Sequence, residues 1–441
     1  MSELVKTTAC CGGERGLDGE LEEKLLLHDD DGVAPPPAKC SAGAAAAALL
    51  QQQKRRREWR GRHHDHDRLR ATGDDVGDDY RERFVRAYDR LRDEILADDS
   101  CELTDEAKTW VAQMIDYNVP GGKLNRGLSV IDSYLLLRQG SEVTEDEFFL
   151  ACVLGWCVEW FQTCALLLDD IMDDSHTRRD QICWYRRSEV GLRGINDGIL
   201  LKCHIARLIK KYFRAKTYYI DISELWNEIA LQTSLGQMLD LISTHNGADE
   251  LPKYNIEGYV VHLTPCITRV AYVVGFLLSS RYRRIVKYKT SYYSFYLPVA
   301  CALLLSGAKL ENFNGLRDIL IEMGIYFQAQ DDYLDCFADP NTIGKIGTDI
   351  EDHKCSWLIV QALGHANNNQ IEVLLKNYGK KDSTSVSKVK STYSTLDLKD
   401  MFSEFEDRAY KHLVTSIEAQ HDRAVQGILK SFLKKIYRRK K

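Results

Sequence analysis

The sequence predicts an all-α fold, a single large helical bundle preceded by a polar tail. Only eight prolines occur among the 441 residues. From about Asp79 onward, apolar residues recur at helical spacing, and the alternation that is typical of strands is scarce. A hydrophobic content of 44% is enough for one large core or two medium ones. We therefore expect one domain of ten or more packed helices over residues 79–441.

Residues 1–78 have a different composition. They include three consecutive prolines, the alanine run Ala44–Ala48, three glutamines, the basic run Lys54–Arg57 and a cluster of histidines and aspartates. Such low-complexity stretches bury too little apolar surface to offset the entropy lost on ordering. The sequence predicts a disordered tail. The basic run is also consistent with a nuclear-import signal, and the histidine cluster is consistent with a metal site. A solvated, disordered tail accounts for both features.

The bundle begins with two recognisable helix starts. Thr104 and Thr144 are each followed by acidic residues, as at capped helix N-termini. Two segments, Phe148–Met172 and Ile319–Phe337, are apolar on most faces, which predicts core helices. A further apolar stretch over 256–280 is consistent with a hydrophobic lid, a loop that touches a membrane, or a passive insertion.

The composition also limits the class of protein. The net charge of −6 provides no overall basic field for nucleic acid, so a phosphate-bearing ligand needs local cations or metal. The thirteen cysteines show no zinc spacing, and those in apolar segments suit buried thiols in a reducing compartment. No stretch is judged long enough for a stable membrane span, and early acidic residues argue against a targeting peptide. We expect a cytoplasmic protein.

Two aspartate clusters carry the strongest chemical signal. Asp169-Asp170-Ile171-Met172-Asp173 and Asp331-Asp332-Tyr333-Leu334-Asp335 share the pattern DDxxD, and each follows apolar helix. On a helix the first and last aspartates lie on one face, where they repel each other and oppose the helix dipole. A hard cation such as magnesium relieves that repulsion. One cluster alone is equally a solvated acidic turn, but two arise by chance only on the order of 0.005 times.

The sequence around both clusters resembles the farnesyl diphosphate synthases, of the trans-isoprenyl diphosphate synthase family. Residues 166–186 are similar to the first aspartate-rich region and residues 324–357 to the second, and the likeness extends from about Tyr80 to the carboxyl terminus. The resemblance implies a helical bundle with a deep central cavity and one motif on each side of its mouth. It also implies a homodimer. It implies three magnesium ions per site, with manganese as a substitute, held by Asp169, Asp170, Asp173, Asp331, Asp332 and Asp335.

The resemblance assigns the substrate residues as well. Lys123 and Arg126, in a glycine-rich GGKLNRG segment, match cations that bind isopentenyl diphosphate; alone, that segment fits an exposed basic turn. The remaining matched residues are Gln162, Arg178, Arg179, Lys289, Thr290, Gln328, Lys345 and Lys354, with Gln237 and Asp240 nearby and a basic tail at 438–441.

The implied reaction is condensation of isopentenyl diphosphate with dimethylallyl and geranyl diphosphate. Cations and magnesium neutralise the leaving diphosphate. The Lys289 carbonyl, the Thr290 hydroxyl and the Gln328 amide oxygen present negative dipoles to the carbocation. The positions where the family carries bulky aromatics are here Cys164 and Ala165. Small residues there predict a deeper pocket and leave open products longer than fifteen carbons, as in geranylgeranyl diphosphate synthases.

Two other classes remain open at this point. A terpene cyclase also uses DDxxD and helices, although it needs no isopentenyl site. A catalytically silent partner subunit would be expected to lose one aspartate cluster, whereas this chain has both.

Overall fold

The computed structural model describes residues 75–245, 280–339 and 347–439. The chain divides into two units, residues 1–51 and 52–441, and every described residue belongs to the second. Within the described ranges, thirteen α-helices and one small hairpin make up the regular structure, apart from short 3₁₀ turns and one π-helix, so the all-α prediction is confirmed. The hairpin pairs β1 (Thr177–Arg178) antiparallel with β2 (Gln181–Ile182). The first helix, α2, spans the boundary predicted at residue 79.

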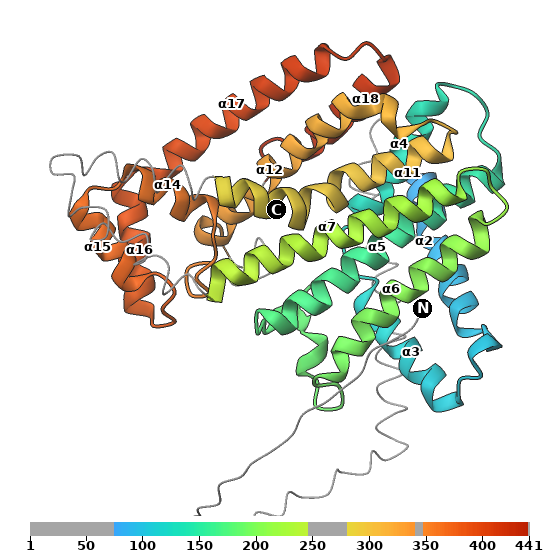
Figure 1. Ribbon diagram of the computed structural model, residues 1–441, viewed down its shortest axis with the longest axis horizontal. Coiled ribbons are helices and arrows are strands. Elements are labelled where there is room, and N and C mark those ends of the chain that lie inside the picture. The colour runs from blue at the N-terminus through green and yellow to red at the C-terminus, as the bar shows by residue number, and fades with distance from the viewer. Residues whose placement is uncertain (1–74, 246–279, 340–346, 440–441) are drawn as a thin grey trace, which may run out of the picture. The chain divides into compact units, whose positions relative to one another are not determined.

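Figure 1 shows the arrangement of the described helices. In chain order they are α2 (Asp75–Leu96), α3 (Asp105–Asn118), α4 (Asn125–Arg138), α5 (Glu145–Met172), α6 (Arg193–Phe213), α7 (Tyr219–His245), α11 (Leu297–Leu305), α12 (Asn314–Phe337), α14 (Trp357–His365), α15 (Asn368–Asn377), α16 (Ser383–Thr395), α17 (Leu398–Glu418) and α18 (Arg423–Ile436).

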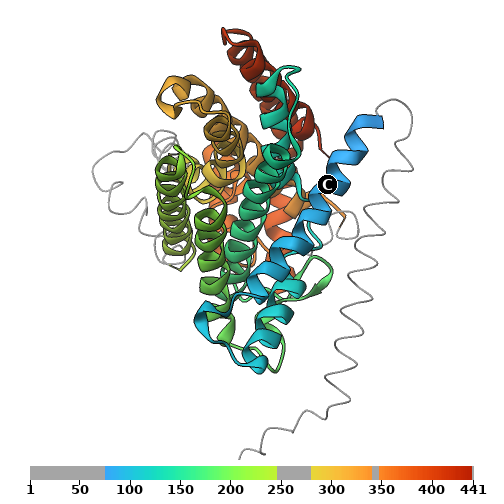
Figure 2. The ribbon, with the colours of Figure 1, turned by 90° about the vertical axis from the view of Figure 1, so that its right-hand side faces the viewer.

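Helix α5 is the centre of the bundle. Figure 2 places α2 on one side of α5 and the α6–α7 pair on the other, and α4 also packs against α5. Thr144 begins α5 with a capping box, in which its hydroxyl accepts from the Glu147 amide and the Glu147 carboxylate accepts from the Thr144 amide. Thr104 caps α3 through its hydroxyl alone, which accepts from the Ala107 amide. Both predicted caps are confirmed.

The composition and length of α5 also meet the criteria for a membrane span, so the expectation that no stretch reaches that length was wrong. However, 78% of its most apolar stretch is buried inside the protein. Trp156 and Trp160, among the largest of its side chains, are fully enclosed. The apolar surface of α5 is therefore used for packing against neighbouring helices.

Residues Lys287–Tyr296 form a π-helix that lies between α7 and α12. Two glycines allow this approach. A Cβ atom at Gly236 of α7 would lie 2.1 Å from the Lys289 backbone nitrogen, and one at Gly324 of α12 would lie 2.6 Å from the Ser291 Cα. Since only glycine lacks a Cβ, these two positions fix how closely α7 and α12 flank the π-helix.

Candidate active site

The first aspartate motif lies at the C-terminal end of α5, where Asp173 is the C-cap residue. Two lysines from later in the chain are paired with it. The Lys289 ammonium donates to Asp169 at 3.0 Å, and the Lys354 ammonium donates to Asp173 at 2.7 Å. Both lysines also donate to Asp240 of α7, at 2.7 and 3.0 Å respectively. Asp240 therefore connects the two cations that lie over the motif.

The charges in this cluster determine one another. Burial opposes the charge on Lys289, but Asp169 and Asp240 outweigh it and raise the pKa of the lysine. Burial likewise opposes the Asp240 carboxylate, and the two lysines lower its pKa. The pKa of Asp173 is raised by burial and by neighbouring Asp169. Thus the three carboxylates can lie close together because the ammonium groups of the two lysines are paired with them.

The second motif, on α12, presents its aspartates in different surroundings. Asp331 receives a 3.2 Å bond from the Arg439 guanidinium and is 41% exposed. Asp332 is buried and accepts from the Gln328 amide at 3.0 Å and the Trp357 backbone amide at 2.7 Å. Burial raises the pKa of Asp332 to about 7, against the effect of those bonds.

Asp335 and Asp170 also interact with the protein. Asp335 accepts from the Asp349 backbone amide at 3.1 Å. Asp170 accepts twice from Arg178, at 2.6 and 3.0 Å. All six predicted metal aspartates accept bonds but from different donors: Asp332 and Asp335 accept from backbone amides, whereas the other four accept from lysine or arginine side chains.

The two motifs are linked through the π-helix. Lys289 is bonded to Asp169, and the adjacent Thr290 hydroxyl donates to the Gln328 amide oxygen at 3.1 Å. Gln328 in turn donates to Asp332 of the second motif. Two neighbouring residues of the π-helix thus join both aspartate clusters, which lie 162 residues apart in sequence (331 − 169).

The hairpin after α5 carries Arg178 and Arg179. Arg179 has a left-handed backbone (φ 54°) and donates to the carbonyls of Asn118, Val119 and Pro120 at 2.6–3.2 Å. Burial lowers the pKa of Arg179, and its partly buried guanidinium lies beside the GGKLNRG segment, because a Cβ at Gly122 would be 3.0 Å from it.

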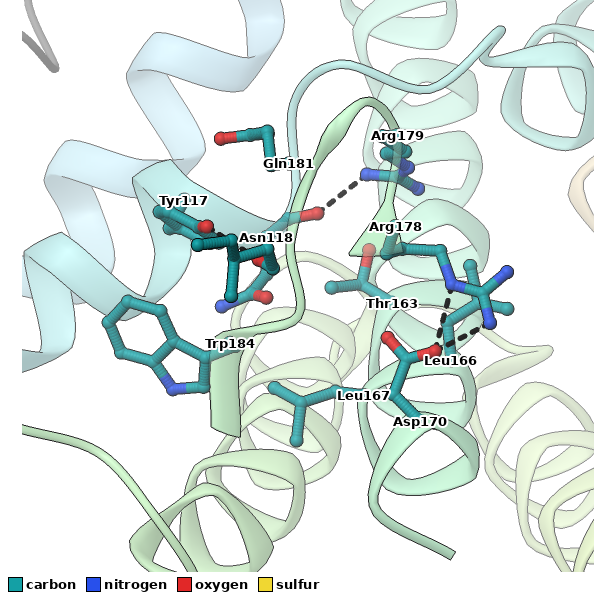
Figure 3. A pocket seen from close by; sticks show the side chains of 11 residues that line it. Tyr117, Asn118, Thr163, Leu166, Leu167, Asp170, Arg178, Arg179, Gln181 and Trp184 are labelled. Carbon is teal, nitrogen blue, oxygen red and sulfur yellow. Dashed lines mark hydrogen bonds and ion pairs between the residues drawn. The ribbon is translucent and has the colours of Figure 1, made fainter. Parts of the chain in front are cut away.

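A pocket of about 350 Å³, part of it open to solvent, lies between this hairpin, the end of α3 and α5 (Figure 3). Arg178 and Asp170 are bonded to each other on one side of it, and Tyr117 and Trp184 lie on the other. Lys289 is not among its lining residues. The pocket therefore adjoins the arginine side of the site rather than the lysines.

The remaining predicted residues have contacts of their own. Arg126 donates to Ser294 at 2.9 Å and lies over the Tyr293 ring, whereas Lys123 is exposed. Gln237 donates to Asp169 at 3.0 Å. Gln162 has a buried side-chain oxygen for which no partner is found.

Part of the prediction falls outside the described residues. Lys345 does, as do the apolar stretch up to residue 279 and the last two residues of the basic tail. Within the described part of the tail, Arg439 packs 3.9 Å from the Phe327 ring centre in addition to bonding Asp331.

Sequence reasoning named Asp240 but not its role, and it missed Glu159. The shared role of Asp240 between the two lysines has no local signal, because its partners come from other segments. Glu159 is buried, and its carboxylate accepts from the Gly127 backbone amide at 2.8 Å. A signal for Glu159 was present, since it is the one acidic residue in the apolar run Phe148–Leu168.

A family model described as polyprenyl synthetase matches residues 108–396. The chain belongs to this family. It is 54% identical to a farnesyl pyrophosphate synthase of Zea mays over 85% of this chain and 100% of that one. It is 52% identical to a mitochondrial farnesyl pyrophosphate synthase of Arabidopsis thaliana over 85% and 91% of the two chains. Among solved structures, a farnesyl diphosphate synthase of T. brucei complexed with risedronate has a TM-score of 0.72 at 32% identity, covering 82% of this chain and 100% of that chain.

The family's divalent metal fits the chemistry of the site. The aspartates provide hard oxygen ligands. Lysine ammonium groups are hydrogen-bonded to Asp169 and Asp173, so a cation is favoured at these carboxylates. In the part of the chain that the structure describes, no three Asp, Glu, His or Cys side chains converge closely enough to hold an ion alone. Magnesium commonly takes one or two carboxylates and completes its shell with substrate phosphates and water, which suits this arrangement.

Cys164 and Ala165, which were predicted to affect product length, point in different directions. Viewed along the helix axis, Cys164, five positions before Asp169, is rotated about 140° from it, and Ala165, four positions before, only about 40°. Consistently, Cys164 is buried and close to α6, since Lys202 and Cys203 of that helix influence the pKa of its thiol. One turn earlier, Phe161 makes edge contacts with Trp226 of α7 at 5.9 Å and Tyr293 of the π-helix at 5.8 Å.

Proposed function

We infer that this chain is a prenyl transferase that makes farnesyl diphosphate by condensing isopentenyl diphosphate with dimethylallyl and geranyl diphosphates. One observation carries the mechanism: Lys289 bonds Asp169, and the adjacent Thr290 bonds Gln328, which bonds Asp332, so one π-helix links both aspartate motifs. Family membership and the relatives' names agree with this activity. Because both aspartate clusters are retained, a catalytically silent partner subunit is not supported.

We propose that Asp169, Asp173 and Asp331 hold the metal, because each accepts from a lysine or arginine side chain that can move to a phosphate. Asp332 and Asp335 accept instead from backbone amides, and Asp170 accepts twice from Arg178. When bound, magnesium supplies neutralisation of the leaving diphosphate. We keep three ions per site as the proposed number, with manganese as a substitute.

We propose that Lys289, Lys354 and Arg178 bind the allylic diphosphate, and that they exchange the carboxylates they now contact for phosphate oxygens. Lys345 is proposed for the same role. Arg126, Arg179, Lys123 and Gln162 are proposed to bind isopentenyl diphosphate.

As the allylic carbon–oxygen bond breaks, these cations stabilise the departing charge in a partly buried setting, where each interaction is stronger than in water. The Thr290 hydroxyl and the Gln328 amide oxygen are within 3.1 Å of each other and are proposed to face the carbocation. Attack by the isopentenyl double bond and loss of a proton to the released diphosphate complete the reaction.

The comparisons do not favour products longer than fifteen carbons. The curated relatives with which this chain shares 52–55% identity are named farnesyl pyrophosphate synthases. We propose that Phe161, Trp226 and Tyr293 close the space that Ala165 leaves open. All three rings are buried and in mutual edge contact through Phe161.

The activity test is incubation of the purified chain with isopentenyl diphosphate and either the C5 or C15 allylic diphosphate, with and without magnesium. We expect metal-dependent C15 product from the C5 substrate and no elongation of the C15 substrate. Trp226→Ala should extend the product distribution beyond C15. If wild type elongates the C15 substrate efficiently, the proposed closure is wrong; if no condensation occurs with magnesium, the assigned activity is wrong.

We propose a homodimer in the cytoplasm. Leu231, Leu235, Met238 and Ile242 recur at helical spacing on α7, and each is more than 40% exposed, which supports a covered face. The nine described cysteines are free, which suits a reducing compartment. One relative is named as mitochondrial, so imaging of a tagged full-length chain is the deciding test of location. Sedimentation of wild type and Leu235→Glu tests the dimer, which that charge should dissociate.

A further inference from the structure

Glu159 is a buried acid that the proposed reaction does not use. It belongs to α5, and only 4% of it is exposed. Its carboxylate accepts from the Gly127 backbone amide at 2.8 Å. Lys, Glu, Arg and Asp are almost never fully buried unless they are paired, so a glutamate at this depth needs a compensating partner.

The first partner of Glu159 is the start of α4. The cap residue Leu124 has a left-handed backbone (φ 58°) and its side chain offers no capping bond. The amides of a helix's first turn lack partners within the helix and carry partial positive charge. Glu159, which comes from another helix, satisfies one of these amides, at the residue next to Arg126.

The contact is held by tight backbone packing. A Cβ at Gly127 would lie 2.8 Å from the Gly155 carbonyl oxygen and 2.9 Å from the Glu159 Cγ. A Cβ at Gly155 would lie 2.7 Å from the Gly127 oxygen. Since α4 and α5 touch at these glycines, the Glu159 carboxylate has little freedom to move away from the start of α4.

The second set of partners is the arginines. The charge of Glu159 raises the pKa of Arg179, whereas burial and the neighbouring cations Arg178 and Arg126 lower it. Arg179 lies against Gly122, two residues after the Pro120 carbonyl that it bonds. Glu159 therefore acts on Arg179 alongside Asp170, and its bond to Gly127 fixes its charge at the residue next to Arg126.

We propose that Glu159 is the internal counter-ion of the isopentenyl diphosphate site, which stabilises the empty arginine cluster and limits how tightly a diphosphate binds there. This rests on the proposed function for the identity of the ligand. An incoming diphosphate is attracted by Arg126, Arg179 and Lys123 but is opposed by Glu159, which cannot leave because it is bonded to Gly127. The carboxylate therefore lowers the affinity for diphosphate, stabilises the empty site and favours release of the ligand.

The test is Glu159→Gln, which keeps the size and an amide oxygen to accept from Gly127, but removes the charge. Titration calorimetry with inorganic pyrophosphate, without metal, should show affinity raised about tenfold, the order expected for one unit charge near a partly buried site. The KM for isopentenyl diphosphate should fall by a similar factor without a matching rise in kcat. The unliganded melting temperature should fall, and pyrophosphate should restore it.

The matched control is Asp116→Asn. Asp116 is also a buried carboxylate, but its partners are Arg92 and Tyr88. This variant should lower the melting temperature and leave pyrophosphate affinity unchanged.

If Glu159→Gln does not fold, the same comparison is made between Arg179→Gln and the double variant Arg179→Gln/Glu159→Gln, in which both opposite charges are removed. In either background, unchanged or weakened pyrophosphate binding on loss of the Glu159 charge overturns the proposal. Because binding is measured without turnover, this outcome is distinct from failure of the condensation assay, which would instead contradict the proposed function.

Discussion

Replacing Gly236 by alanine tests how strictly the π-helix is positioned. The added Cβ would lie 2.1 Å from the Lys289 nitrogen, 2.5 Å from the Tyr288 carbonyl carbon and 2.6 Å from the Lys289 Cα. All three contacts are with backbone, so no side-chain rotation relieves them. An ordinary contact begins near 3.4 Å, so α7 and the π-helix would have to separate by about 1.3 Å (3.4 − 2.1).

That separation acts directly on the site. Gly236 precedes Asp240 by four residues, one helical turn, and Lys289 bonds Asp240 at 2.7 Å and Asp169 at 3.0 Å. A shift of more than 1 Å would lengthen both bonds beyond hydrogen-bonding range. Misplacement of about 1 Å costs on the order of 10²-fold in rate. Overpacking of this kind also destabilises by about 1–3 kcal/mol.

The assay is kcat for condensation at saturating substrates, together with thermal unfolding. Gly236→Ala should lower kcat about 100-fold while the protein remains folded. Gly364→Ala is the matched control, since nothing lies within 4 Å of a Cβ there. Alanine in that helix should be neutral or stabilise by up to about 1 kcal/mol. A kcat for Gly236→Ala within threefold of wild type would refute the argument that this glycine positions Lys289.

Three further perturbations have defined outcomes. Burial lowers the pKa of His204 to about 4, below its unfolded value, so the unfolded state binds more protons in acid. About 2 kcal/mol of stability should therefore be lost from pH 7 to pH 5. The stability difference between wild type and His204→Leu, measured by urea unfolding at both pH values, should change by that amount, and a constant difference would exclude the effect. Thr144→Ala removes the cap of α5 and should cost about 1 kcal/mol by denaturant unfolding with kcat retained, so an unchanged midpoint would argue against the capping box. Asp240→Asn leaves Lys289 and Lys354 with one fewer carboxylate and should lower kcat by about 10²-fold or more in single-turnover assays, whereas near-normal turnover would show that Asp240 does not position the lysines.

Local sequence decided much of the fold. Acidic first turns after Thr104 and Thr144 predicted two helix starts, and both are capped as expected. The apolar runs predicted the core helices, which extend only a few residues beyond the predicted bounds, as Glu145–Met172 and Asn314–Phe337. Capping and apolar periodicity depend on residues within a few positions of one another, so a single sequence suffices to read them.

The sequence by itself also determined the chemistry, because two DDxxD clusters after apolar helix make the same unfavourable charge arrangement twice. Only the tertiary structure decided which donor each aspartate accepts from. Asp170, Asp332 and Asp335 are held by Arg178, a backbone amide of Trp357 and one of Asp349. Such pairings join residues 8–25 positions apart or more, and depend on the direction in which each side chain leaves its helix.

The site's charge balance was likewise decided by packing. Asp240 accepts from Lys289 and Lys354, and Glu159 accepts from the Gly127 amide, so the partners of both carboxylates lie in other segments of the chain. The proposed closure beside Ala165 also required the structure, since the rings of Trp226 and Tyr293 reach Phe161 from other elements. Coulomb interactions and ring contacts depend on distance in space, which periodicity along one helix does not encode.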